Sequence, residues 1–129
     1  MRYLLDTHTA VWSAVATHRL PQSLVELILA EENDVYVSVV TLFEIAIKNA
    51  PGRRHQMPIS VTDAARFFDE VPYATLNVEP SHAAALETLP IQHRDPFDRM
   101  LLAQAMATGM RLITRDRTLA EHSDVVLSF

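Results

Sequence analysis

The sequence predicts an α/β fold in which a mainly parallel central sheet of four to five short strands lies between helices, giving three α/β/α layers. Short apolar runs alternate with longer helical patterns along the whole chain, as expected when a crossover helix follows each strand. The short runs are mostly apolar, which is typical of strands covered on both faces. With 129 residues, 49% of them apolar, we expect residues 1–129 to form a single domain.

The elements follow from composition, periodicity and capping residues. Apolar and β-branched composition predicts strands over residues 3–5, 35–39, 74–78, 111–114 and 125–129. Periodicity and caps predict helices over residues 7–15, 22–32, 41–50, 62–70, 81–89 and 96–108, and a helical turn over 117–122. Asp6 or Thr7 is the expected N-cap of the first helix, and Gly109 is expected to end the helix that begins at Pro96.

The helix predicted over residues 96–108 is apolar nearly all round. A helix without a polar face lies deep in a core or at a contact between subunits. Because a domain of this size has a limited interior, we expect part of this helix to pack against another chain.

Composition excludes several classes of protein. The chain has no cysteine, which rules out disulfides and cysteine-ligated zinc and fits a reducing cytoplasm. The first apolar run is broken at Asp6, so we expect no signal peptide, and no stretch reaches the roughly 18 apolar residues of a membrane span. With only two glycines there is no glycine-rich phosphate loop, which excludes nucleotide-dependent kinases and Rossmann dehydrogenases.

Four carboxylates share one predicted location. Asp6 and Asp116 follow strands, Glu44 lies in the helix after the second strand, and Asp98 opens a helix. Because the ligand crevice of a parallel sheet lies beyond the carboxyl ends of its strands, we expect all four at one edge. Like charges in a crevice repel one another and are tolerated when a hard cation such as Mg²⁺ or Mn²⁺ neutralises them. Such a site is suited to hydrolysis of a phosphodiester by a metal-activated water.

Each acid also has a local structural explanation. Asp6 can cap the helix that follows it, and Thr41-Leu42-Phe43-Glu44 has the spacing of a capping box. Asp95 can serve as an N-cap followed by a proline at the first helical position. Taken singly, each acid is therefore better explained by structure, and only the shared edge favours chemistry.

Four segments together carry a resemblance to a known family: residues 4–8, 41–45, 93–105 and 112–116. The segment Asp95-Pro96-Phe97-Asp98-Arg99 is the most specific of them. In order and spacing the four resemble the PIN-domain nucleases and, more narrowly, the VapC-type toxins of type II toxin–antitoxin pairs. The likeness covers almost the whole chain.

The resemblance implies a metal-dependent endoribonuclease whose four ligands fall on Asp6, Glu44, Asp98 and Asp116. It implies supporting hydroxyls at Thr7 and Thr114. Asp95 would be a secondary candidate that caps its helix or orients a bound water. It also implies a homodimer, a cognate antitoxin as partner and RNA as substrate.

The net charge of −5 argues against a nucleic-acid partner unless a local basic patch overcomes it. The candidate phosphate-binding residues are Lys48, Arg53, Arg54, Arg99 and Arg115, with Arg94 and Arg117 also flanking the proposed ligands. Trp12 is expected in the core, without a role in RNA stacking. Two alternatives stay open: a non-catalytic PIN-like binding module, and a DNA nuclease or phosphatase that uses the same site.

Overall fold

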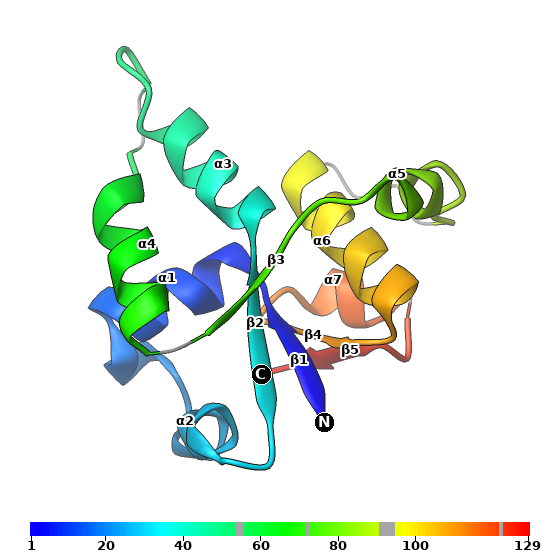
Figure 1. Ribbon diagram of the computed structural model, residues 1–129, viewed down its shortest axis with the longest axis horizontal. Coiled ribbons are helices and arrows are strands. Elements are labelled where there is room, and N and C mark those ends of the chain that lie inside the picture. Colours follow the sequence, from blue (N-terminus) through cyan, green and yellow to red (C-terminus); the bar gives the residue numbers. More distant parts are fainter. Residues whose placement is uncertain (54–55, 72, 91–94, 122) are drawn as a thin grey trace.

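The computed structural model describes residues 1–53, 56–71, 73–90, 95–121 and 123–129. These residues form a five-stranded sheet in the order β3-β2-β1-β4-β5, and every neighbouring pair of strands is parallel (Figure 1). The strands are β1 (Arg2–Leu5), β2 (Asp34–Ser38), β3 (Ala74–Leu76), β4 (Arg111–Thr114) and β5 (Val126–Ser128). The predicted mainly parallel sheet is confirmed.

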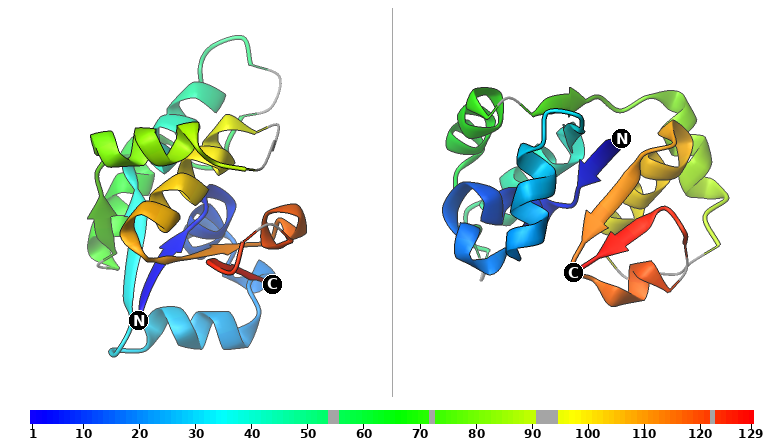
Figure 2. Two further views of the ribbon diagram at one scale, coloured as in Figure 1. Left: turned by 90° about the vertical axis from the view of Figure 1, so that its right-hand side faces the viewer. Right: turned by 90° about the horizontal axis from the view of Figure 1, so that it is seen from below.

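Helices cover both faces of the sheet. They are α1 (Thr7–Val15), α2 (Gln22–Leu29), α3 (Val39–Lys48), α4 (Val61–Glu70), α5 (Pro80–Glu87), α6 (Pro96–Thr108) and α7 (Arg117–Ala120), with a short 3₁₀ turn, η1 (Thr17–Arg19). Figure 2 shows α1 and α2 on one side of the sheet and α6 on the other. The predicted three-layer α/β/α architecture is therefore confirmed. No helix in the described ranges is long and apolar enough to cross a bilayer.

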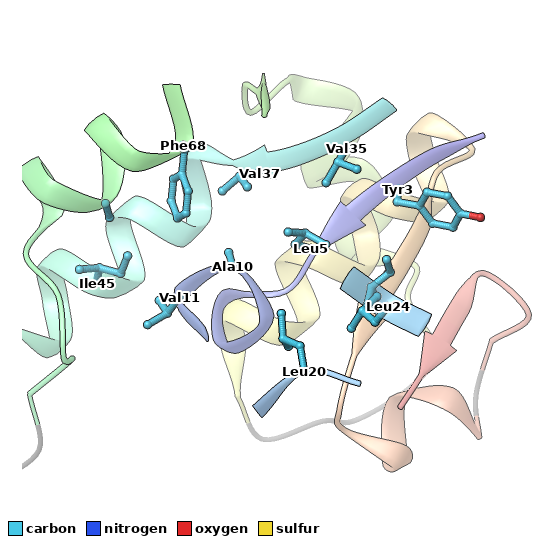
Figure 3. Packing of buried hydrophobic residues seen from close by; sticks show 12 residues of the cluster. Tyr3, Leu5, Ala10, Val11, Leu20, Leu24, Val35, Val37, Ile45 and Phe68 are labelled. Atoms are coloured by element: carbon cyan, nitrogen blue, oxygen red, sulfur yellow. The ribbon is translucent and has the colours of Figure 1, made fainter. Parts of the chain in front are cut away.

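Two apolar clusters fill the space between the layers, because successive strand residues point to opposite faces. Tyr3 and Leu5 belong to a cluster with side chains of α1, α2, α3 and α4 (Figure 3). Leu4, between them, packs on the other face against Leu101 and Leu102 of α6. Both faces of β1 are thus buried, which explains its uninterrupted apolar sequence.

The strand register aligns the carboxyl ends of β1, β2 and β4, which is the edge of the sheet where the functional site was predicted. Leu5 lies beside Val37 of β2 and Ile113 of β4, so these strands end at the same level. The backbone N–H of Asp6 continues the ladder by donating to the Ile113 carbonyl at 3.0 Å. The residues that follow β1, β2 and β4 therefore all lie at the same edge of the sheet, beyond the carboxyl ends of these strands.

The helix α3 begins two residues earlier than predicted. The Ser38 hydroxyl caps it by accepting a hydrogen bond from the Val40 N–H at 3.0 Å. The Thr41 hydroxyl is instead buried in a hydrogen bond with the Thr7 hydroxyl (3.2 Å). The capping box expected at Thr41 and Glu44 is consequently wrong, and both side chains are available for other contacts.

Some other elements also end away from the predicted residue, while several agree with prediction. Helix α2 stops at Leu29 rather than at residue 32, and the Asn33 side-chain amide donates to the Leu27 carbonyl at 2.9 Å near its end. The bounds of α1, α6 and β4 agree with those predicted. Gly109 ends α6 with a φ of 71°, a conformation that glycine adopts without strain.

The apolar sequence of α6 is largely explained within the chain. Leu101, Leu102 and Ala105 pack toward the sheet, while α5 packs along another side of the helix. Met106 stays exposed. Contact of α6 with a second chain remains a prediction.

A buried polar network anchors α6 between β2 and α5. The Gln104 side chain is 1% exposed, and its Oε1 accepts from the Ser38 hydroxyl at 2.5 Å. Its Nε2 donates to the Asn77 carbonyl (3.4 Å) and to His82 Nδ1 (3.2 Å), and Nδ1 also accepts from the Glu79 N–H. One side chain therefore connects three elements and holds the α6 helix in place.

We predict that Gln104→Leu lowers the free energy of unfolding by about 2–4 kcal/mol, because it leaves the buried Ser38 and His82 groups without a partner. Urea unfolding at constant m-value measures this. The matched control is Gln22→Leu, at an exposed glutamine whose single side-chain contact is 3.5 Å long. Equal unfolding midpoints for the two variants would contradict the structural role of Gln104.

Candidate active site

Asp6 lies at the carboxyl end of the central strand β1 and is 4% exposed. Its Oδ1 accepts from the Thr9 N–H at 2.8 Å, so the carboxylate caps α1, and its Oδ2 accepts from the Thr114 hydroxyl at 2.5 Å. Burial raises the pKa of the Asp6 carboxyl, although hydrogen bonds from Thr114 and Thr9 and the charge of His8 oppose the shift. The end of β1 therefore holds an acid whose charged form the protein stabilises only in part.

The Thr114 hydroxyl connects Asp6 to Asp116. It donates to Asp6 and accepts from the Asp116 N–H at 3.0 Å. The half-buried Asp116 carboxylate caps α7 through the Thr118 N–H at 2.9 Å and also accepts from the Thr118 hydroxyl. Thr114 therefore contacts both segments, and its supporting role beside a metal ion stays a prediction.

Glu44 lies on α3 and is 1% exposed. Its Oε2 is paired with the Lys48 ammonium one turn further along the helix. Its Oε1 is buried and has no hydrogen-bond partner among the described residues. The hydroxyl pair of Thr7 and Thr41 joins the start of α1 to α3 on the same side of the molecule.

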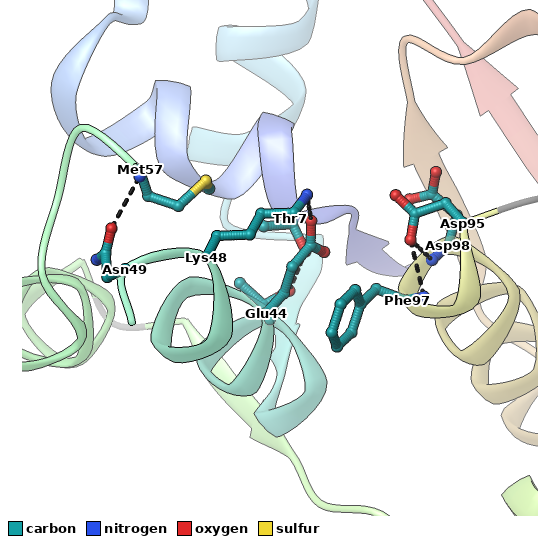
Figure 4. Close-up of polar contacts among 9 residues, drawn as sticks. Thr7, Glu44, Lys48, Asn49, Met57, Asp95, Phe97 and Asp98 are labelled. Atoms are coloured by element: carbon teal, nitrogen blue, oxygen red, sulfur yellow. Dashed lines mark hydrogen bonds and ion pairs between the residues drawn. The ribbon is translucent and has the colours of Figure 1, made fainter. Parts of the chain in front are cut away.

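The N-terminus of α6 contributes Asp95 and Asp98. Asp95 is the N-cap, as predicted, and its Oδ1 accepts from the N–H groups of Phe97 (2.9 Å) and Asp98 (3.4 Å). Since α6 leads back to the start of β4, its own start lies toward the carboxyl edge of the sheet (Figure 1). Figure 4 shows Glu44 and Asp98 on α3 and α6, with the Phe97 ring between the two helices.

The elements that carry the four predicted ligands thus meet at one edge, but the side chains are directed to different partners. Within the described part of the chain, no three histidine, aspartate or glutamate side chains stand close enough to hold one metal ion. Asp6 is bound to Thr9 and Thr114, and Glu44 to Lys48. A shared metal site at Asp6, Glu44, Asp98 and Asp116 stays a prediction.

The chemistry of the donors nevertheless fits a divalent cation. The unpartnered Glu44 Oε1 and the buried Asp6 carboxyl are both costly without a positive charge nearby. All four candidates offer carboxylate oxygen, the donor that Mg²⁺ and Mn²⁺ prefer. Lys48 provides an ion pair to Glu44.

The candidate phosphate-binding residues divide into three groups. Arg53 is exposed and lines a cleft of about 680 Å³ with Lys48, His8 and Trp12. Arg99 is half-buried, and its Nε has no hydrogen-bond partner in the described ranges. Arg115 is exposed and lies over Trp12. Arg54 and Arg94 lie outside the described residues.

Three features of the site were not predicted from sequence. Gln104 was part of a quoted motif without a role, and Thr41 was expected to be a cap. Trp12 does pack against the core, as expected, but it is only half-buried and carries two guanidinium groups on its ring. Gln104 and Thr41 bond to partners distant in sequence, and Arg115 reaches Trp12 from the other end of the chain, so no local pattern indicated these contacts.

Comparison with known proteins identifies the family. The PIN domain model matches residues 3–125. The chain therefore belongs to the PIN-domain family. Within it, the chain is a VapC-type protein: it is 33% identical over 120 residues to Ribonuclease VapC22 of Mycobacterium tuberculosis (strain ATCC 25618 / H37Rv), covering 92% of this chain and 90% of the relative.

Solved structures share the fold. VapBC2 from Rickettsia felis, bound to a DNA fragment from its promoter, aligns with a TM-score of 0.69 at 14% identity, over 100% of this chain and 98% of that chain. DNA-bound VapBC from Salmonella typhimurium gives 0.65 at 15% identity, over 100% and 97%. A toxin–antitoxin complex from Klebsiella pneumoniae gives 0.63 at 16% identity, over 98% and 96%.

The raised pKa of Asp6 predicts a pH-dependent stability in the metal-free protein. Because the folded chain binds this proton more tightly than the unfolded chain, the stabilising contribution is complete below the ordinary aspartate pKa of about 3.9 and is lost as pH rises through the raised value. In EDTA, the free energy of unfolding should therefore fall with rising pH relative to Asp6→Asn, whose amide still caps α1. Urea titrations from about pH 3.5 to about pH 8 measure the difference. Parallel curves for the two proteins would contradict the raised pKa.

Proposed function

We propose that the chain is a metal-dependent endoribonuclease that acts as the toxin of a toxin–antitoxin pair. The observation that carries the proposal is the joining of Asp6 to Asp116 through Thr114 at the carboxyl edge, where the helices bearing Glu44 and Asp98 also meet. Membership of the PIN-domain family and the relative named a ribonuclease support it.

The proposed roles follow from the contacts of each residue. Asp6, Glu44, Asp98 and Asp116 would hold the metal ion, Mg²⁺ or Mn²⁺. When bound, the ion would polarise a phosphodiester oxygen and lower the pKa of a water molecule for attack on phosphorus. For Glu44, Oε1 would be the ligand oxygen, because Oε2 is paired with the Lys48 ammonium and Oε1 has no hydrogen-bond partner among the described residues.

The surrounding groups orient the acids. Thr114 fixes one oxygen of Asp6, and Asp95 holds the first turn of α6, from which Asp98 projects. Asp95 is therefore a positioning residue in this scheme.

The proposed partners are an RNA substrate and a cognate antitoxin, since all three structural neighbours named above are toxin–antitoxin complexes. A homodimer also belongs to the proposal. Phe43 and Ile47, one turn apart on α3, are 60% and 46% exposed and offer an apolar face for it. We place the protein in the cytoplasm, where its substrate is found.

The central test is Asp98→Asn. We expect this variant to fold like the parent. Its rate of RNA cleavage should fall at least about a hundredfold, because one metal ligand loses its charge. Cleavage of a labelled RNA in Mn²⁺, with and without EDTA, measures the loss, and growth inhibition on expression should disappear as well. The matched control is Asp63→Asn, at an exposed acid in the first turn of α4.

The same variants separate the alternatives. Mn²⁺ should raise the melting temperature of the parent and not of Asp98→Asn, because an ion that binds only the folded state stabilises it. Unchanged cleavage by Asp98→Asn would refute the proposed site. No stabilisation by Mn²⁺ and no cleavage would favour a binding module, and faster cleavage of DNA or a phosphomonoester would favour the other enzymes.

A further inference from the structure

Two arginine side chains lie over the ring of Trp12, which is not part of the proposed metal site. The guanidinium carbon of Arg19 lies 5.4 Å from the centre of the Trp12 ring, and that of Arg115 lies 5.5 Å from it. The His8 ring meets the same indole edge-on, with centroids 5.9 Å apart. Side chains from α1, from η1 and from the segment after β4 are therefore held together by one aromatic ring.

The two arginines, together with Arg117, line one cleft of about 600 Å³. We call it the arginine cleft; the rest of its lining is His18, Leu20, Pro21 and Phe129. All three arginine side chains are exposed. The cleft thus combines a cationic wall with apolar surface, in a volume within the usual range for sites that bind small molecules.

The arginines of this cleft have no carboxylate partner among the described residues. Among the described residues, ion pairs join Lys48 to Glu44 and Arg66 to Asp63, and none involves Arg19, Arg115 or Arg117. The whole chain carries a net charge of −5, so three guanidinium groups in one cleft, none of them in an ion pair with another described residue, are a local reversal of sign. Such a cluster is stabilised by an anion, and guanidinium groups bind phosphate with paired hydrogen bonds.

The position of the cleft indicates which kind of phosphate it would bind. Arg115 and Arg117 flank Asp116 in the sequence, and Arg115 directly follows Thr114, which donates to Asp6. A polynucleotide with one phosphodiester at the acidic edge would therefore have a neighbouring phosphate within reach of the cleft. Apolar surface and guanidinium planes can also stack an unpaired base, as in other single-strand RNA sites.

We propose that the arginine cleft binds a backbone phosphate of single-stranded RNA next to the bond to be cut, with Trp12 positioning Arg19 and Arg115. The assignment rests on the proposed function for its choice of RNA. It adds a second contact with the strand, so that affinity for RNA comes from the cleft rather than from the acidic edge.

Trp12 is the sole tryptophan of the sequence and contacts two arginines of the cleft, so its fluorescence reports on the surroundings of Arg19 and Arg115. We would titrate the protein in EDTA with a single-stranded RNA of about ten nucleotides at several salt concentrations, following Trp12 emission. We expect emission to change on saturation. The slope of log K against log salt should fall by about 0.7 for each phosphate contact removed.

The test variant is Arg19→Gln with Arg115→Gln. Both residues are exposed, so the fold should be retained, and a melting curve checks this. We expect the Kd for RNA to rise at least about tenfold at low salt, and the salt slope to fall by about 0.7, because the contact with one phosphate is lost. The control is Arg66→Gln on α4, which removes a positive charge near the β3 edge of the sheet, away from β4 and β5.

The outcomes separate this inference from the proposed function. If the double variant and Arg66→Gln bind RNA equally well, or if saturating RNA leaves Trp12 emission unchanged, the arginine cleft is not a strand-binding site. Binding of inorganic pyrophosphate to the cleft without binding of RNA would overturn it too. If the expected binding changes occur but the parent cleaves no RNA in Mn²⁺, the inference stands and the proposed catalysis fails.

Discussion

The burial of one carboxylate at the end of the central strand determines how the rest of this molecule is arranged. Asp6 is almost inaccessible, and a carboxylate in that position is costly unless hydrogen bonds or a cation compensate it. The protein provides two such bonds, from Thr9 in the helix that follows and from Thr114 at the end of the neighbouring strand. These bonds fix the start of α1 against β4, and the Thr114 hydroxyl also accepts from the Asp116 N–H. They still leave the pKa of Asp6 raised, because burial outweighs them.

Local chemistry made much of the fold predictable. The limits of α1 and α6 were predicted correctly because each helix starts at an aspartate that caps it, and because Gly109 alone can end α6 without strain. The parallel sheet followed from the alternation of strands and helices. The start of α3 was missed because Thr41 looks like a cap in sequence, whereas in space its hydroxyl bonds to Thr7. A contact of that kind depends on the completed fold and leaves no local pattern.

For the candidate site, the sequence predicted where the elements meet but not how the side chains are directed. The parallel winding was enough to bring the elements carrying Asp6, Glu44, Asp98 and Asp116 to one edge. The directions of the side chains were not predictable, since Lys48 and Thr114 compete for their oxygens. Trp12 was correctly expected against the core, but its role in gathering Arg19 and Arg115 depends on residues from opposite ends of the chain. The acidic edge and the arginine cleft together would let a protein with a net negative charge hold both a metal ion and a polyanion.

The most direct test of the central claim is diffraction from crystals soaked in Mn²⁺, recorded with its anomalous signal. We expect a peak at the carboxyl edge of the sheet, with oxygens of Asp6 and at least one of Glu44, Asp98 and Asp116 at about 2.1 Å from the ion, as for hard cations of this size. An ordered Mn²⁺ bound elsewhere, with the Asp6 carboxylate still held only by Thr9 and Thr114, would contradict it.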